Sequence, residues 1–184
     1  MVEDWEKLGS RALADYRVLR VRQDTVRSPR TNAVHDFFVL EMDPWINIIA
    51  ITPQRKVVMI HQYRHGTEEV SLEIPGGLVE GDDASMAEAA HRELIEETGY
   101  DAEEMVFLGK VKPNPALQDN QCHSFLALGA HPIGAQNLDA GEDILVEEIP
   151  LEEIPGLIAA GRINHGLVVA AFYFLEQYEK GHPE

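Results

Sequence analysis

Three glutamates near the middle of the chain have the residue type and spacing to bind a cation. Glu96 and Glu97 follow Glu93 by three and four residues, and a helix that turns about 100° per residue places all three on one side. Like charges at this spacing destabilise a helix, and the C-terminal half of a helix is unfavourable for anions. Mg²⁺ or Mn²⁺ would reverse both effects, because these ions bind carboxylate oxygens and bridge to phosphates. For the spacing alone, a solvated acidic face is the more common explanation.

The helix that must carry these glutamates is the clearest element of the sequence. Apolar residues recur at four-residue spacing over residues 84–98, and Gly99 follows as the expected C′ residue. Before the helix, a short strand over 70–74 runs into Pro75-Gly76-Gly77, which should end it. The sequence therefore predicts a strand, a glycine-rich turn and the helix in close succession.

The remaining segments predict a mixed sheet covered by helices. Strands are expected over residues 16–26, 33–42, 46–51, 56–63, 105–112, 121–128 and 143–149, and helices over 151–160 and 165–179. Segments 46–51 and 56–63 are mostly apolar and lie close together in the sequence, which is typical of a hairpin buried in a central sheet. Segment 129–142 is polar and glycine-rich and is expected to form a loop. This irregular alternation of strands and helices indicates an α/β or α+β fold.

Composition and charge exclude several functional classes. The 184 residues fit one domain, and Lys+Arg 15 against Asp+Glu 32 gives a net charge of −17. Such a surface repels phosphate backbones and anionic lipids, so neither nucleic acid nor membrane is an expected partner. An anionic small molecule would need local arginines or divalent cations. The lone Cys122 excludes an internal disulfide and is expected to be inert core, and the polar start of the chain is unlike a signal peptide, so we expect a cytoplasmic protein.

The predicted helix and the turn before it resemble the Nudix box, a signature written GX5EX7REUXEEXGU in which U is a bulky apolar residue. Residues 92–100 match every fixed position of REUXEEXGU. The first half of the box departs from the pattern, because one extra residue precedes the helix. In the carboxylate-rich loop that contains Glu80, Asp82 and Asp83, Asp83 is the residue nearest to the first glutamate of the box.

The resemblance extends to the ADP-ribose and nucleotide-sugar pyrophosphatases of this superfamily. Segments similar to theirs are His61-Gln62-Tyr63-Arg64, Leu72-Glu73-Ile74-Pro75-Gly76-Gly77, Asn114-Pro115-Ala116 and Gly141-Glu142-Asp143. The resemblance implies an α/β/α sandwich around a mixed sheet for residues 44–184, the Nudix hydrolase domain. Residues 1–43 would form an N-terminal antiparallel strand extension that pairs with a second subunit in a homodimer.

The resemblance also assigns roles in metal binding. Glu93 and Glu97 would bind Mg²⁺ or Mn²⁺, with Glu96 as a third or bridging ligand and the carbonyl of Gly76 as a backbone ligand. Arg92 would be the structural arginine that holds the catalytic loop through its carboxylates. With the phosphates neutralised, water can attack phosphorus in line.

The same comparison suggests a base and a substrate site. Glu142 is the best positional match to a catalytic glutamate that related enzymes carry on the loop over 129–142. Asp139 is the weaker candidate, Glu96 is the next one on the helix, and an acidic loop that only keeps the protein soluble is the alternative. Arg64 would hold a phosphate or the terminal ribose, and Glu73 would accept hydrogen bonds from ribose hydroxyls; a solvated strand end and a sheet cap are the structural alternatives.

Two further residues are given structural interpretations. Trp45 could stack on adenine, but an aromatic residue at a strand end more often belongs to the core or to an interface. His165 has no partner at metal-ligand spacing, so a role as a metal ligand is not favoured.

The function implied is Mg²⁺-dependent hydrolysis of ADP-ribose to AMP and ribose 5-phosphate. GDP-mannose or another nucleoside diphosphate sugar is an alternative substrate. A non-catalytic domain that senses a nucleotide sugar is the alternative outside enzymes, and it is disfavoured because all three helix carboxylates are present.

Overall fold

The computed structural model describes residues 1–81 and 83–182, so Asp82 of the predicted acidic loop lies outside the described residues. The chain forms two compact units. The first consists of Met1–Pro44 and Lys112–Gln121, and the second of the rest of the described chain. Each unit is considered by itself below.

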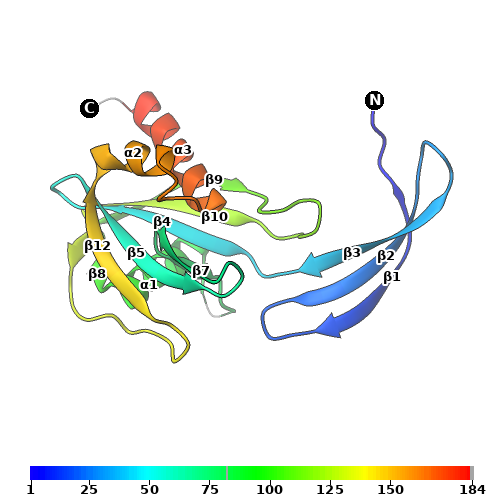
Figure 1. The fold of residues 1–184 in the computed structure, drawn as a ribbon, viewed down its shortest axis with the longest axis horizontal. Helices are drawn as coiled ribbons and strands as arrows, with labels where there is room; N and C mark the ends of the chain where they lie inside the picture. Colours follow the sequence, from blue (N-terminus) through cyan, green and yellow to red (C-terminus); the bar gives the residue numbers. More distant parts are fainter. Residues whose placement is uncertain (82, 183–184) are drawn as a thin grey trace. The chain divides into compact units, whose positions relative to one another are not determined.

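The second unit is built on a mixed seven-stranded sheet (Figure 1). Its strands are β4 (Trp45–Ile51), β5 (Lys56–Arg64), β6 (Glu69–Glu73), β7 (Gly76–Leu78), β9 (Glu104–Val111), β10 (Cys122–Leu128) and β12 (Ile144–Pro150). The order is β12-β5-β4-β10-β9, with β6 paired to β5 and β7 paired to β4. The pair β4–β10 is parallel and the others are antiparallel. Two short strands, β8 (Tyr100–Asp101) and β11 (His131–Pro132), pair separately.

Helices cover both faces of this sheet. Helix α1 (Met86–Thr98) lies on one face, and the 3₁₀ turn η1 (Leu151–Glu153), α2 (Ile154–Ala159) and α3 (Gly166–Gly181) lie on the other (Figure 1). Alternate residues of β4 divide between the two cores: Ile48 and Ala50 pack with α1, whereas Ile49 and Ile51 pack with α2 and α3. A strand that is buried on both faces has to be apolar throughout. The predicted α/β/α sandwich is therefore confirmed.

Helix α1 begins where its local sequence can cap it. The hydroxyl of Ser85 accepts a hydrogen bond from the Glu88 amide at 3.1 Å, and the Glu88 carboxylate accepts one from the Ala84 amide at 2.8 Å. The helix thus begins two residues later than predicted. It ends as predicted at Gly99, whose φ of 71° favours glycine.

The predicted hairpin of β4 and β5 lies in the central sheet, but the two strands share only the pair Ile51↔Val57, because β4 takes β10 and β7 as its other partners. Strand β6 ends at Glu73, before Pro75-Gly76-Gly77, as predicted. The sequence did not indicate that Gly76 and Gly77 begin a further strand, β7, which pairs with Trp45–Asn47 of β4. A side-chain carbon at Gly76 would overlap the carbonyl oxygen of Ile46, so this close approach requires glycine.

The first unit is a three-stranded antiparallel sheet of β1 (Glu6–Asp15), β2 (Arg20–Arg27) and β3 (Val34–Glu41). Strand β1 was not predicted, because its residues are nearly all exposed and have no apolar alternation. The strand predicted over 16–26 begins only at Arg20, after a turn closed by the bond from the Tyr16 amide to the Leu19 carbonyl.

The described helices include none that is long and apolar enough to cross a membrane.

Candidate active site

Two of the three helix glutamates are withdrawn from solvent beside the glycine turn. Glu97 is 2% exposed, and its Oε2 accepts a hydrogen bond from the Gly76 amide at 2.8 Å. The carboxylate of Glu93 lies directly over Gly77, where a side-chain carbon would overlap it. Leu94, which is buried next to them on the helix, anchors α1 in the core. The turn and the helix therefore place two carboxylates side by side, as the predicted helix geometry requires.

Burial perturbs both of these carboxylates. It raises the pKa of Glu93 to about 7, against the opposing charge and hydrogen bond of Arg92. It raises the pKa of Glu97 to about 8, against the opposing hydrogen bond from Gly76. The charge of Glu142 adds to both shifts, so Glu142 lies within electrostatic reach of the pair. Burying the carboxyl groups of Glu93 and Glu97 close together costs stability. Such perturbed groups are typical of a functional site.

Arg92 connects the loop before α1 to the helix. Its Nε and Nη2 donate to the two oxygens of Asp83 at 3.1 and 3.0 Å, and Nη2 also donates to the Leu78 carbonyl at 3.1 Å. Its Nη1 lies 3.0 Å from both Glu93 Oε1 and Glu96 Oε2. Hydrogen bonds from Arg92 and from the Glu80 amide hold the pKa of Asp83 below its usual range. The extra residue before the helix thus does not prevent Asp83 from reaching Arg92.

The donor set suits a hard divalent cation. Oxygen ligands, burial and a local excess of negative charge are what Mg²⁺ and Mn²⁺ require. Within residues 1–81 and 83–182, however, no three acidic, histidine or cysteine side chains already form a group that could hold an ion. Arg92 engages Glu93 and Glu96, and Glu97 faces the Gly76 amide. A cation would therefore bind the carboxylate oxygens that Arg92 leaves free, Glu93 Oε2 and Glu96 Oε1, or displace the guanidinium.

The loop that carries Glu142 is attached to the end of α1. The Nε2 of Gln136 donates to the Glu97 carbonyl at 2.6 Å and to the Ile144 carbonyl at 3.1 Å. The Asn137 amide donates to the Glu96 carbonyl at 2.9 Å. The carbonyls of Glu96 and Glu97 are among those that a helix end leaves free, so these donors satisfy them. Glu142 closes the loop on itself by accepting a hydrogen bond from the Asp139 amide at 2.9 Å.

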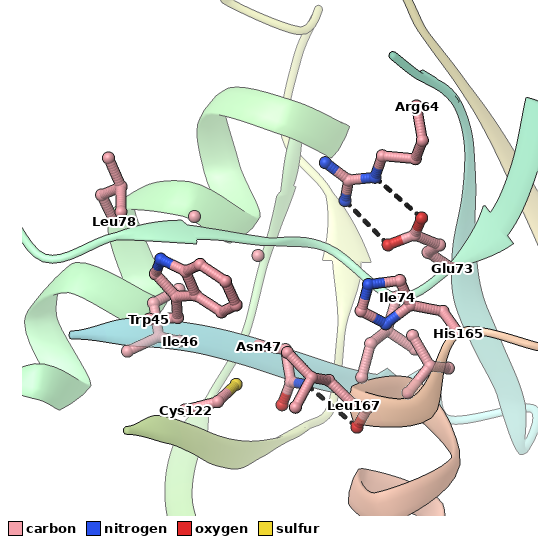
Figure 2. A pocket seen from close by; sticks show the side chains of 13 residues that line it. Trp45, Ile46, Asn47, Arg64, Glu73, Ile74, Leu78, Cys122, His165 and Leu167 are labelled. Atoms are coloured by element: carbon pink, nitrogen blue, oxygen red, sulfur yellow. Dashed lines mark hydrogen bonds and ion pairs between the residues drawn. The ribbon is translucent and has the colours of Figure 1, made fainter. Parts of the chain in front are cut away.

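A pocket of about 300 Å³ opens beside the glycine turn (Figure 2). Arg64 and Glu73 form a bidentate ion pair in its wall, with Nε–Oε1 and Nη2–Oε2 distances of 2.8 and 2.7 Å. Burial alone would raise the pKa of Glu73, but Arg64 and its other neighbours hold the pKa below the usual value. The indole of Trp45 forms another part of the wall, and His165 stands beside the ion pair (Figure 2).

The structure thus brings most of the predicted site residues into one region of the second unit. Arg64 and Glu73, which are predicted to bind substrate, both line the pocket and form an ion pair with each other. Cys122 is buried in the same wall, and burial raises the pKa of its thiol to about 12, as expected of an unreactive core thiol. Sequence reasoning missed Gln136 and Asn47, because an amide in a loop or a strand carries no signal of a long-range contact.

Comparison with known proteins identifies the family and the fold of this chain. The NUDIX domain family matches residues 43–172. The chain is 33% identical over 165 residues to the methanol dehydrogenase activator of Bacillus methanolicus, which covers 89% of this chain and 88% of that protein. It is 29% identical over 136 residues to the ADP-ribose pyrophosphatase of Bacillus subtilis, covering 73% of this chain and 72% of that protein. A crystal structure of an ADP compounds hydrolase shares the fold with a TM-score of 0.86, at 22% identity and over 100% of this chain and 98% of that one.

Proposed function

The chain belongs to the NUDIX domain family and is a Nudix hydrolase, and we propose that it hydrolyses the pyrophosphate bond of ADP-ribose or a related nucleoside diphosphate sugar. The observation that carries this proposal is the pair Glu93 and Glu97, held at the glycine turn that also borders the pocket. The ADP-ribose pyrophosphatase relative supports the choice of substrate class.

The proposed reaction breaks one bond and forms one. The oxygen of water bonds to a phosphorus while the bridging P–O bond breaks, which yields a nucleoside monophosphate and a sugar phosphate. Glu93, Glu97, Glu96 and the carbonyl of Gly76 would hold Mg²⁺ or Mn²⁺. When bound, the cation neutralises phosphate charge and lowers the pKa of water.

Other residues of the chain would position the reactants. Glu142 would orient and deprotonate the attacking water, since its charge already acts on Glu93 and Glu97. Arg92 would keep the loop at Asp83 in place. Arg64 and Glu73 would contact the substrate at the pocket wall.

A panel of nucleotides incubated with the full chain and Mg²⁺ tests this proposal. The panel contains ADP-ribose, GDP-mannose, other nucleoside diphosphate sugars and nucleoside triphosphates, and the assay quantifies nucleoside monophosphates, sugar phosphates and free phosphate. We expect ADP-ribose to give AMP and ribose 5-phosphate in equal amounts without free phosphate. Preference for GDP-mannose would select the alternative substrate. Hydrolysis of triphosphates alone would contradict the proposal.

A second candidate function is regulation of a dehydrogenase, favoured by the likeness to the methanol dehydrogenase activator. Adding the chain to methanol dehydrogenase with Mg²⁺, and measuring methanol oxidation, tests it. Glu97→Gln separates the two ideas: activation that survives in the variant would be independent of hydrolysis.

A further inference from the structure

Asn47 is a polar residue in a strand that is otherwise apolar. All the other residues of β4 are apolar, and Asn47 itself is 6% exposed. Its Oδ1 has no hydrogen-bond partner among the described residues. A buried polar atom without a partner costs stability, and a leucine of similar volume would avoid this cost. Packing of the core therefore does not explain why this position is an asparagine.

The amide nitrogen of Asn47 has a partner in helix α3. Its Nδ2 donates a hydrogen bond to the Leu167 carbonyl at 3.3 Å, which Figure 2 shows as a dashed line at the start of the helix. Leu167 belongs to the first turn of α3, so this bond joins the central sheet to the beginning of the helix. A leucine at position 47 would lack the donor, so this bond is what the asparagine adds.

The first turn of α3 has little in its own sequence to hold it in place. The N-cap residue is His165, whose side chain forms no capping hydrogen bond, and the first turn contains no acidic residue. Gly166 comes next, and glycine is a weak helix former. A helix start without a cap or a favourable charge opens more easily than the rest of the helix. An outside contact such as that of Asn47 therefore has a large share in fixing this turn.

The same turn forms one wall of the pocket beside the glycine turn. His165, Leu167 and Val168 line this pocket. The ring of His165 stands beside the ion pair of Arg64 and Glu73 (Figure 2), and its charge helps to keep the pKa of Glu73 below the usual value. The pocket therefore keeps one shape only while the first turn of α3 stays in place.

We propose that Asn47 is a positioning residue of the active site, which holds the first turn of α3 against the sheet and so keeps the pocket wall ready to bind substrate. The inference rests on the proposed function and deepens it. A wall that is already ordered binds a ligand without the cost of ordering it, so loss of the bond should weaken substrate binding. The carboxylates Glu93 and Glu97 belong to α1 instead, so the chemical step should change little.

The first test separates KM from kcat, using the full chain with ADP-ribose and Mg²⁺. We expect Asn47→Leu to raise KM by about three- to fivefold and to change kcat by less than about twofold, with a melting temperature that is unchanged or higher. Asn47→Ala is a second variant that should also raise KM, even if leucine distorts the core.

Ser124 provides a matched control for the loss of a buried polar group. It is the register partner of Asn47 on β10, and its buried oxygen likewise lacks a partner within the described part of the chain. It has no printed tie to α3 to lose, so Ser124→Ala should leave KM and kcat unchanged. An equal rise of KM in Ser124→Ala and Asn47→Leu would overturn the proposal.

A second substitution tests whether Asn47 acts through α3. A side-chain carbon at Gly166 would meet no atom within 4 Å, so Gly166→Ala strengthens the first turn without a clash. Added to Asn47→Leu, it should recover about half of the lost affinity. A direct contact between Asn47 and the substrate would not be restored in this way. Absence of any recovery therefore contradicts the proposal.

Hydrogen exchange follows the same turn without substrate or metal. The Val169 amide donates to the His165 carbonyl at 3.1 Å, so its exchange rate reports how often the turn opens. We expect this exchange to be about three- to fivefold faster in Asn47→Leu and unchanged in Ser124→Ala. Equal rates in Asn47→Leu and the natural chain, or faster exchange with an unchanged KM, overturn the proposal. If the natural chain hydrolyses no nucleotide of the panel, the proposed function fails, and exchange alone still decides whether Asn47 holds the turn.

Discussion

Glu97 and Glu93 place two carboxyl groups where water is largely excluded, and the arginines near them also pair with other carboxylates. Burial raises the pKa values of these two glutamates to about 8 and about 7. Arg92 is shared with Glu96 and Asp83, and Arg64 is paired with Glu73. Carboxylates thus outnumber arginines at this site, and this excess favours the binding of a divalent cation.

The first prediction concerns these ligands. Glu93→Gln or Glu97→Gln keeps the side-chain volume but removes a charged oxygen, so we expect kcat to fall by about a thousandfold or more at saturating Mg²⁺. The metal-free variants should melt at the same temperature as the natural chain or a few degrees higher, because like-charge repulsion is relieved. Glu88→Gln, on the exposed side of the same helix, serves as the control. Near-normal turnover in either ligand variant would remove the basis of the mechanism.

The second prediction follows from the raised pKa values. Glu93 and Glu97 bind protons in the metal-free fold up to about pH 7 and 8, whereas unfolded glutamates release them near pH 4.5. The folded state thus holds more protons over this range, and its stability must fall as the pH rises from about 5 to 8. Thermal melts without metal should show this fall. In Glu97→Gln the fall should be smaller.

Mg²⁺ should have the opposite effect on how stability depends on pH. A cation needs the ionised carboxylates, so its affinity rises with pH through the same range, and it should stabilise the chain most at pH 8. Melting temperatures that are independent of pH between 5 and 8 without metal would show that these carboxylates are not perturbed.

At the scale of elements, α1 and the loop after β11 are connected through Gln136. Its amide joins the Glu97 carbonyl at the end of α1 to the Ile144 carbonyl at the start of β12. Since Glu142 lies between Gln136 and β12, this brace limits where the Glu142 carboxylate can be.

The third prediction tests this brace. Gln136→Ala removes both hydrogen bonds, and we expect kcat to fall about tenfold, while Mg²⁺ affinity changes little because the helix carboxylates are untouched. Amide hydrogen exchange in the loop should become faster. Asn137→Ala is a matched control, because its contact to Glu96 is made by the main chain. Equal effects of the two substitutions would mean that the Gln136 side chain has no special role.

At the scale of the whole molecule, the two units differ in how they bury apolar surface. Among the described residues, the buried apolar side chains all belong to the second unit. The strands β1–β3 and the residues next to them instead expose large apolar side chains, namely Trp5, Leu8, Leu13, Tyr16, Val18, Val34, Phe37 and Phe38. A small sheet without a core needs a partner surface. We therefore propose that residues 1–43 mediate a homodimer.

The fourth prediction is that the chain is a dimer at micromolar concentration in light scattering. Trp5→Glu combined with Phe37→Glu should shift it toward monomer, because these rings are in contact on one sheet face and are 43% and 50% exposed. Tyr173→Glu, at an aromatic position on α3 that is 59% exposed, should leave the dimer intact. A fully active monomer would contradict the prediction.

Some features of this protein depend on neighbouring residues alone, and the sequence was sufficient for them. Helix α1 and its end at Gly99 follow from local periodicity and capping chemistry, and the spacing of Glu93 and Glu97 follows from the helical repeat. The layered α/β class follows from the alternation of apolar strands and helices. These are short-range effects, so they can be read along the chain.

Other features depend on which distant segments meet, and only the tertiary structure decided them. The parallel pairing of β4 with β10, the inclusion of Gly76-Gly77 in the sheet as part of β7, and the strand β1 are set by main-chain hydrogen bonds that leave no side-chain pattern. The same holds for the site. The sequence determined that carboxylates share one face of α1, whereas long-range packing decided that Gln136 braces the loop and that Asn47 and His165 face the pocket, because the neighbours of a buried polar group come from remote parts of the chain.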